Sequence, residues 1–201
     1  MIAIIDYGVG NLRSVEKAFE KVGVEAKITT SPEMINKACG LVLPGVGAFG
    51  DAMQNLHKSG LVPTLLKNIE DGKPLLGICL GLQLLFSYSE EGGLFEGLNV
   101  IPGRVIRFKG NVKVPQVGWN QIKKKKDSLL LKGIEDGENF YFVHSYYVVP
   151  DEKECILATT EYSVEFPSVV GKGLIFGIQF HPEKSSDKGL RILKNFGELV
   201  K

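Results

Sequence analysis

Cysteine is scarce in this sequence, and the few cysteines lie far apart. Cys39, Cys79 and Cys155 are the only three among 201 residues. Disulfide-stabilised domains and structural zinc sites need cysteines in larger or more closely spaced sets. The sequence therefore excludes a disulfide framework, predicts no metal site and fits a protein of the reducing cytoplasm.

Net charge and long apolar runs are also lacking. The 24 Lys and Arg nearly balance the 23 Asp and Glu, giving a formal net charge of +1, so there is no basic footprint for nucleic acid. The one basic run, Lys123 to Lys126, precedes a turn-like Asp127-Ser128 and is interpreted as a solvated hairpin or loop rather than a phosphate site. The apolar run from Met1 stops at Asp6, too early for a signal peptide or a membrane span, so we expect a first core strand there.

Strand-like and helix-like segments alternate through the first 88 residues. With 44% hydrophobic residues the chain can fill one core, and we expect residues 1–201 to form a single domain. The order β-α-β-α-β-α-α-β-α is typical of an open, mostly parallel sheet with helices on both faces. Asp51 is expected to cap the third helix, and Phe86 to lie on the apolar face of the last. The predicted strands span residues 1–6, 24–28, 41–43 and 75–78, and the predicted helices 12–22, 32–38, 52–58, 63–71 and from 80 onward.

The second half has a different pattern, with β-rich segments broken by Gly, Pro, Asn and Asp. Such segments are typical of hairpins and meanders, so we expect extra antiparallel strands at residues 100–108, 117–122, 140–149, 156–162 and 166–170. A final buried strand is predicted from Leu174 to Phe180, followed by a closing helix that begins at Ser185 or Ser186.

A possible nucleophile lies between the apolar run that ends at Ile78 and the helix that follows. Gly77-Ile78-Cys79-Leu80-Gly81 has the G-x-C-x-G pattern of a nucleophile elbow with cysteine in the serine position. Glycines two residues before and after the nucleophile allow strand, turn and helix to pack closely. A helix N-terminus would also favour the thiolate. The alternative is a buried cysteine that acts only as a small apolar residue.

Two glycine-rich turns invite a comparison with nucleotide-binding loops. Gly8-x-Gly10 is not a dinucleotide fingerprint, because Arg13 occupies the position of the third glycine. The loop Pro44 to Gly50 exposes backbone N–H groups, which suit either a phosphate or a developing oxyanion. Without a Walker-type lysine the phosphate reading is the weaker one.

A cysteine nucleophile needs a base, and the chain has only His57, His144 and His181. Both His144 and His181 follow apolar strand-like runs, but only His181 has a carboxylate two positions on, at Glu183. Residues i and i+2 of an extended segment point the same way, which predicts a Cys79-His181-Glu183 triad. The alternative is that His181-Pro182-Glu183 is merely the exit from a strand.

The reaction predicted from these groups is attack on a carbonyl through a thioester-like acyl intermediate. The oxyanion would accept hydrogen bonds from the N–H of Leu80 and from one of Val46 or Gly47.

Taken together, these residues resemble the class I (triad-type) glutamine amidotransferases, a family with a flavodoxin-like α/β fold. Within that class the chain is similar to the glutaminase subunits of imidazole glycerol phosphate synthase, an enzyme of histidine biosynthesis. The motifs that carry the resemblance are Gly77 to Gln83, Asp6 to Ser14, Pro44 to Gly50, Gly118 to Asn120, Tyr141 to Tyr146 and Phe180 to Ser185.

The resemblance implies a substrate, glutamine, and no cofactor. Cys79 attacks the side-chain amide, His181 protonates the departing ammonia, and water releases glutamate. The residues implied to hold the substrate are Gly47, Gln83, Glu91, Ser145 and Tyr146. Glu90 is an alternative partner for the substrate ammonium. The alternative to substrate binding is that Glu90 and Glu91 simply form an exposed acidic turn.

The resemblance also implies a partner, a (β/α)8 cyclase subunit that forms a heterodimer with this chain and receives the ammonia. The residues implied to face it are Gly10, Asn11, Trp119, Asn120 and Lys184. Ammonia released into water would be protonated, so we expect little glutamine hydrolysis without the cyclase. The alternatives are a glutaminase of another synthase, a cysteine-triad peptidase or γ-glutamyl hydrolase, and a non-catalytic subunit with the same fold.

Overall fold

The computed structural model, which describes residues 1–200, is built around an eight-stranded sheet with the strand order β2-β1-β3-β4-β14-β13-β12-β9. The first five of these strands are parallel to one another and the last three pairings are antiparallel. This agrees with the predicted fold class. The strands are β2 (Ala26–Thr29), β1 (Ile2–Ile5), β3 (Gly40–Gly45), β4 (Leu75–Cys79), β14 (Ile175–Ile178), β13 (Val164–Lys172), β12 (Ile156–Tyr162) and β9 (Lys123–Lys124).

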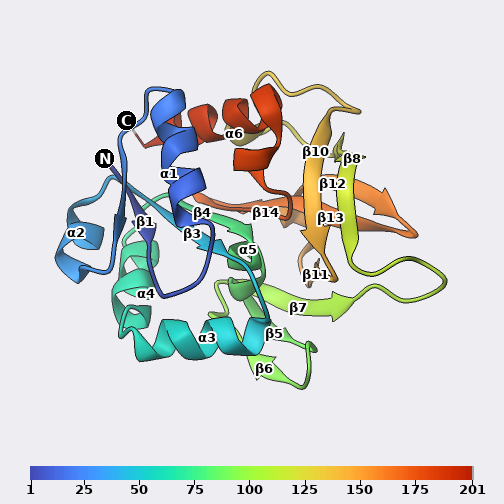
Figure 1. Ribbon diagram of the computed structural model, residues 1–201, viewed down its shortest axis with the longest axis horizontal. Coiled ribbons are helices and arrows are strands. Elements are labelled where there is room, and N and C mark those ends of the chain that lie inside the picture. The colour runs from blue at the N-terminus through green and yellow to red at the C-terminus, as the bar shows by residue number, and fades with distance from the viewer. Residues whose placement is uncertain (201) are drawn as a thin grey trace.

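Helices pack on both faces of the sheet (Figure 1). On β1, Ile2 and Ile4 pack in the core with α1 (Leu12–Lys21) and α6 (Ser186–Leu199), while Ala3 and Ile5 pack with helices of the opposite face. This alternation follows from the two-residue repeat of a strand. The helices opposite α1 and α6 are α2 (Pro32–Lys37), α3 (Phe49–Lys58) and α4 (Val62–Glu70). The predicted order of elements is confirmed as far as Leu84.

One helix begins earlier than predicted. Helix α3 starts at Phe49, with Ala48 at the N-cap position and no side-chain cap from that residue. Asp51 lies within the first turn, so the prediction that it caps the helix is wrong. The fully buried Phe49 ring anchors the start of the helix, and its N–H donates to the carboxylate of Glu91 at 2.8 Å.

The helix after the elbow is shorter than predicted. Helix α5 spans only Leu80–Leu84, and Phe86 begins β5 (Phe86–Ser89) instead of continuing the apolar face of the helix. The carbonyl of Leu85 accepts hydrogen bonds from the N–H groups of Val100 and Ile101. Pairing with a distant strand therefore ends the helix, and the local spacing of apolar residues cannot predict this.

The second half adds two small sheets. In one, β8 (Gln116–Gln121) pairs with β10 (Asn139–His144); in the other the order is β11-β7-β5-β6, formed by β11 (Tyr146–Pro150), β7 (Ile101–Arg107), β5 and β6 (Phe95–Glu96). The single segment predicted at 140–149 is thus two strands in different sheets, which separate at Ser145. Lys123 and Lys124 form the short edge strand β9, where a solvated hairpin or loop was predicted. Within residues 1–200, no helix has the length and apolar content needed to cross a membrane.

Candidate active site

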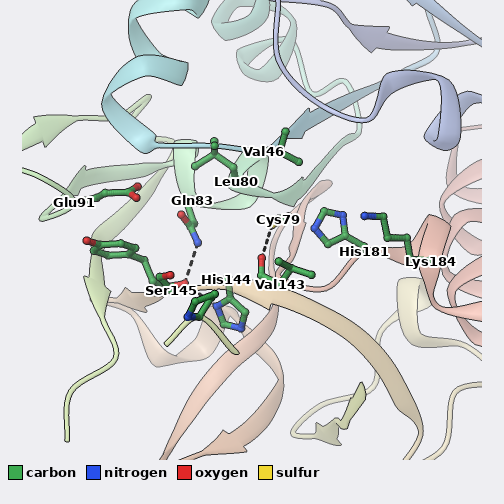
Figure 2. A pocket seen from close by; sticks show the side chains of 13 residues that line it. Val46, Cys79, Leu80, Gln83, Glu91, Val143, His144, Ser145, His181 and Lys184 are labelled. Carbon is green, nitrogen blue, oxygen red and sulfur yellow. Dashed lines mark hydrogen bonds between the residues drawn. The ribbon is translucent and has the colours of Figure 1, made fainter. Parts of the chain in front are cut away.

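A cavity of about 260 Å³ opens at the carboxyl end of the parallel strands, where open α/β sheets bind ligands. The parallel strands β3, β4 and β14 all end at this edge. Among residues 1–200, no cluster of His, Cys, Asp and Glu is arranged to hold a metal ion. The cavity is lined by Val46, Gly47, Cys79, Leu80, Gln83, Glu91, Pro115, Val143, His144, Ser145, Tyr146, His181 and Lys184, and Figure 2 shows Glu91 at one end of it and His181 with Lys184 at the other.

Cys79 has the backbone geometry of a nucleophile elbow. Its φ of 55° and ψ of −109° lie in a region that side-chain-bearing residues rarely adopt. The flanking glycines are required by close packing, because a Cβ on Gly81 would lie 1.8 Å from the carbonyl oxygen of Leu43, and one on Gly77 would lie 2.8 Å from that of Gly81. Helix α5 has only five residues, so its dipole is small.

His181 and Glu183 are joined by a hydrogen bond of 2.9 Å between Nδ1 and Oε1. The expected extended segment is instead a 3-10 helix over Pro182–Lys184, with His181 as its N-cap. The turn brings the carboxylate back to the ring. Burial disfavours the imidazolium, but the hydrogen bonds of His181 with Cys79 and Glu183 outweigh it and raise the pKa of His181 to about 10. Since Nδ1 is occupied by Glu183, Nε2 is the atom that faces the sulfur.

Two further groups contact the sulfur of Cys79. Sγ lies 3.8 Å from the carbonyl oxygen of Val143, and 3.8 Å from the side-chain Nε2 of Gln179. Gln179 is a residue that sequence reasoning missed. It precedes the F-H-P-E motif by one position, and the only signal was a polar residue inside an otherwise apolar predicted strand.

The predicted oxyanion-hole residues Leu80, Val46 and Gly47 all line the cavity. The start of their loop is held by Tyr7, whose hydroxyl donates to the carbonyl of Pro44 at 2.7 Å. Burial, and secondarily the charge of Cys79, raises the pKa of Tyr7 well above its usual range, so this hydroxyl remains a donor. Beyond that anchor Gly47 has a φ of 99°, and a Cβ there would meet no atom within 4 Å.

The predicted substrate-binding residues also lie around the cavity. Gln83 donates through Nε2 to the carbonyl of Tyr146 at 3.0 Å and to Oε1 of Gln179 at 3.1 Å. Glu91 lines the cavity, whereas Glu90 is exposed and does not. The structure therefore favours Glu91 over Glu90 as a partner for a ligand.

His144, one of the three candidate bases, has both ring nitrogens occupied by other groups. Nδ1 lies 2.8 Å from the carbonyl of Tyr146 and Nε2 lies 2.9 Å from the side-chain amide of Gln116. Burial lowers the pKa of His144 to about 4, more than its hydrogen bond to the Tyr146 carbonyl raises it. The neutral ring thus fixes the Ser145-Tyr146 segment. The third histidine, His57, is exposed on α3 and does not line the cavity.

The predicted partner-facing residues lie on three segments: the turn before α1, strand β8 and the 3-10 helix that follows His181. Gly10 lies beside the oxyanion loop, since a Cβ on it would be 3.6 Å from that of Pro44. Asn11 is the N-cap residue of α1 but makes no side-chain capping bond. Trp119 is 55% exposed and its ring packs edge-on against Tyr141 at a centroid distance of 5.9 Å.

The other two predicted partner-facing residues differ in their contacts. Lys184 lines the cavity next to His181 (Figure 2). Asn120 donates to the carbonyl of Glu161 at 2.9 Å, so its side chain is partly committed within this chain.

Residues 3–199 match the family model described as glutamine amidotransferase class-I. The chain belongs to the class I glutamine amidotransferase family. Among its curated relatives, a protein of Moorella thermoacetica named imidazole glycerol phosphate synthase subunit HisH is 56% identical over 200 residues, covering 100% of this chain and 95% of the relative. A protein of the same name from Caldanaerobacter subterraneus subsp. tengcongensis is 55% identical over 201 residues, covering 100% of this chain and 99% of the relative. Within the glutamine amidotransferases, the chain groups with these HisH proteins.

Solved structures of glutamine amidotransferases have the same fold. A crystal structure described as a glutamine amidotransferase aligns with a TM-score of 0.74 and 22% identity, covering 100% of this chain and 99% of that chain. The PurLQS structure from Thermotoga maritima aligns with a TM-score of 0.76 and 17% identity, covering 100% and 98%. At these identities the likeness shows the fold alone.

Proposed function

We propose that this glutamine amidotransferase hydrolyses glutamine to glutamate and ammonia through a thioester on Cys79, and supplies the ammonia to the synthesis of imidazole glycerol phosphate. The observation that carries the proposal is the strained Cys79 elbow facing the hydrogen-bonded pair His181 and Glu183 in one cavity. Membership of the family and similarity to the HisH subunits support both halves of the statement.

The acylation step uses the groups around the elbow. The thiolate of Cys79 attacks the side-chain amide carbon of glutamine, and the oxyanion accepts hydrogen bonds from Leu80 N–H and from the N–H of Val46 or Gly47. His181 Nε2 then gives its proton to the leaving nitrogen, the C–N bond breaks and ammonia departs. Glu183 holds the imidazolium through Nδ1.

Deacylation reverses these roles. Water attacks the thioester carbon, His181 Nε2 takes its proton, and the C–S bond breaks to release glutamate and the Cys79 thiolate. The imidazolium returns to its starting state, ready for the next substrate. In enzymes with an oxyanion hole, loss of one hydrogen-bond donor raises the activation free energy by roughly 3 kcal/mol.

Substrate recognition follows from the polar groups that are still free in the cavity. Both N–H groups of Gln83 are committed, to Tyr146 and Gln179, so its Oε1 is the atom left to accept from a ligand. Glu91 supplies a carboxylate at the far end of the cavity from His181 (Figure 2). An acceptor and an anion together suit the α-ammonium group of glutamine.

For the partner, we propose a (β/α)8 cyclase subunit that forms a heterodimer over the cavity entrance. Three exposed apolar side chains favour an interface: Val46, which lines the cavity, and Val117 and Trp119 on β8, which pairs with the cavity-lining strand β10. Lys184 also lines the cavity, and Gly10 lies beside Pro44 at the start of the loop from Pro44 to Gly50. Free ammonia at neutral pH is rapidly protonated and is then no nucleophile, so hydrolysis without the cyclase should be slow.

The test combines covalent labelling with a coupled assay. A diazoketone analogue of glutamine should alkylate Cys79, faster when the cyclase subunit is present, and the labelled peptide is identified by mass spectrometry. Glutamine-dependent cyclase product should disappear in Cys79→Ala and persist in the matched controls Cys39→Ser and Cys155→Ser. Label on Cys39 or Cys155 instead, or fast hydrolysis without any cyclase, would contradict the proposal.

A further inference from the structure

Gln179 has no part in the mechanism above, yet it lies beside the nucleophile. Strands β4 and β14 pair in parallel with Ile78 opposite Ile178, so the next residues along the two strands, Cys79 and Gln179, are neighbours. The side chain of Gln179 is fully buried, and its backbone N–H donates to the carbonyl of Ser168 at 2.9 Å. A buried amide needs hydrogen-bond partners, and those of Gln179 are both functional groups.

The orientation of the Gln179 amide is fixed by a chain of donors and acceptors. The carbonyl of Tyr146 can only accept, and it lies 3.0 Å from Gln83, so the NH2 group of Gln83 must face it. The other N–H of Gln83 then points at Gln179, 3.1 Å away, which must present its oxygen. The NH2 group of Gln179 is therefore directed at the sulfur of Cys79, 3.8 Å away.

We propose that Gln179 is a positioning residue with two tasks: its N–H directs and stabilises the Cys79 thiolate, and its oxygen holds Gln83 with the acceptor toward the substrate. The proposal rests on the proposed function, in which Cys79 is the nucleophile. A donor aimed at a buried anion favours the charged form. Orienting a ligand-binding side chain through a buried neighbour is the usual means of holding a site to sub-ångström tolerance.

The charge state of the sulfur depends on several groups besides Gln179. His181 and Tyr7 are both close enough to the sulfur for their charges to interact with it. The remaining titratable side chains that line the same cavity are Glu91, His144, Tyr146 and Lys184. Gln179 is a neutral donor. A change in the titration of Cys79 in Gln179→Met therefore reports a lost hydrogen bond and not a lost charge.

Two variants separate the tasks. Gln179→Met has a similar volume but no N–H donor, and its sulfur is only a weak acceptor. Gln179→Glu keeps an oxygen for Gln83 and puts a carboxylate beside the sulfur. Asn68→Leu is the matched control, because Asn68 is a buried amide with two hydrogen bonds on α4, away from the cavity. All are measured as the full chain, with and without the cyclase subunit.

The first readout is the rate of Cys79 alkylation by iodoacetamide between pH 6 and pH 10, followed on the Cys79 peptide. In Gln179→Met the apparent pKa of the alkylation should rise by about one unit, which is roughly tenfold less thiolate at low pH, and in Gln179→Glu by about one to three units. Asn68→Leu should keep the wild-type profile even if it lowers the melting temperature.

The second readout is the rate of labelling by the diazoketone analogue, divided by the iodoacetamide rate at the same pH. This ratio reports recognition of the glutamine shape, and should fall about tenfold in Gln179→Met and stay within about twofold of wild type in Gln179→Glu. Wild-type alkylation profiles in both variants would overturn the inference, and Gln179→Glu alone decides it if Gln179→Met does not fold. Failure of the analogue to label Cys79 in the wild type would instead overturn the proposed function.

Discussion

Replacement of Gly81 by Ala tests whether the elbow depends on close packing between α5 and β3. The new Cβ would lie 1.8 Å from the carbonyl oxygen of Leu43, about 1.6 Å inside the start of ordinary contact at 3.4 Å. Leu43 is held in the middle of the sheet by pairing with Gly77, so α5 must move instead. Overpacking against backbone costs about 3 kcal/mol, which for a chain of this size lowers the melting temperature by about 6–12 °C.

The same displacement shifts Cys79 and the N–H of Leu80, which are continuous with α5. A misplacement of about 1 Å costs roughly 100-fold in rate, so labelling of Cys79 by the diazoketone analogue should slow by about that factor. Gly60→Ala is the control, because Gly60 has a φ of +72° but no atom within 4 Å of its Cβ position; it should cost about 1 kcal/mol and leave labelling unchanged. A Gly81→Ala protein with wild-type melting temperature and labelling within about twofold would refute the packing argument.

Three further predictions concern other parts of the site. Because the pKa of His181 is raised from 6.5 to about 10, its contribution to stability is complete below pH 6.5 and is lost as pH rises through 10. Denaturant unfolding across that range should show the wild type losing stability relative to His181→Asn. Parallel curves of unfolding free energy against pH would contradict this prediction. Glu91→Gln keeps an acceptor for Phe49 and should raise the half-saturating glutamine concentration about tenfold at nearly constant stability. Glu91→Ala should also lose about 1 kcal/mol of unfolding free energy. Equal stability of the two variants would exclude the capping role. Trp119→Ala should weaken cyclase binding by roughly 30-fold in a titration. It should not change stability, since the side chain is 55% exposed. The control Leu129→Ala should bind the cyclase normally, because Leu129 is 65% exposed and does not line the cavity.

The parts of the fold that follow from local pattern were predicted correctly. Alternating apolar runs and amphipathic helices predicted the β-α order as far as Leu84, because the spacing of apolar residues is a local property of each segment. The G-x-C-x-G elbow was predictable for the same reason. Its pattern lies within five consecutive residues, although the contact that requires glycine at position 81 is with Leu43 on the neighbouring strand.

The errors share a different cause, which is pairing between distant segments. Phe86 leaves the predicted helix because β5 pairs with β7, and the segment around Ser145 divides because its two halves join different sheets. The cap of α3 comes from Glu91, 42 residues away from its partner Phe49. None of these contacts has a local signature, so periodicity alone could not reveal them.

The register between β4 and β14 connects the fold to the chemistry. Gly77 lies opposite Gly177, and Ile78 opposite Ile178, so two segments about 100 residues apart reach the cavity in step. A slip of one residue would reverse which face each side chain points to, and would carry Gln179 and then His181 away from Cys79. Glycine at position 177 allows α5 to pack over this pair of strands, because a Cβ there would lie 2.2 Å from the Cδ1 atom of Leu82. A larger residue at position 177 should therefore displace the buried Leu82 side chain of α5, close to the nucleophile.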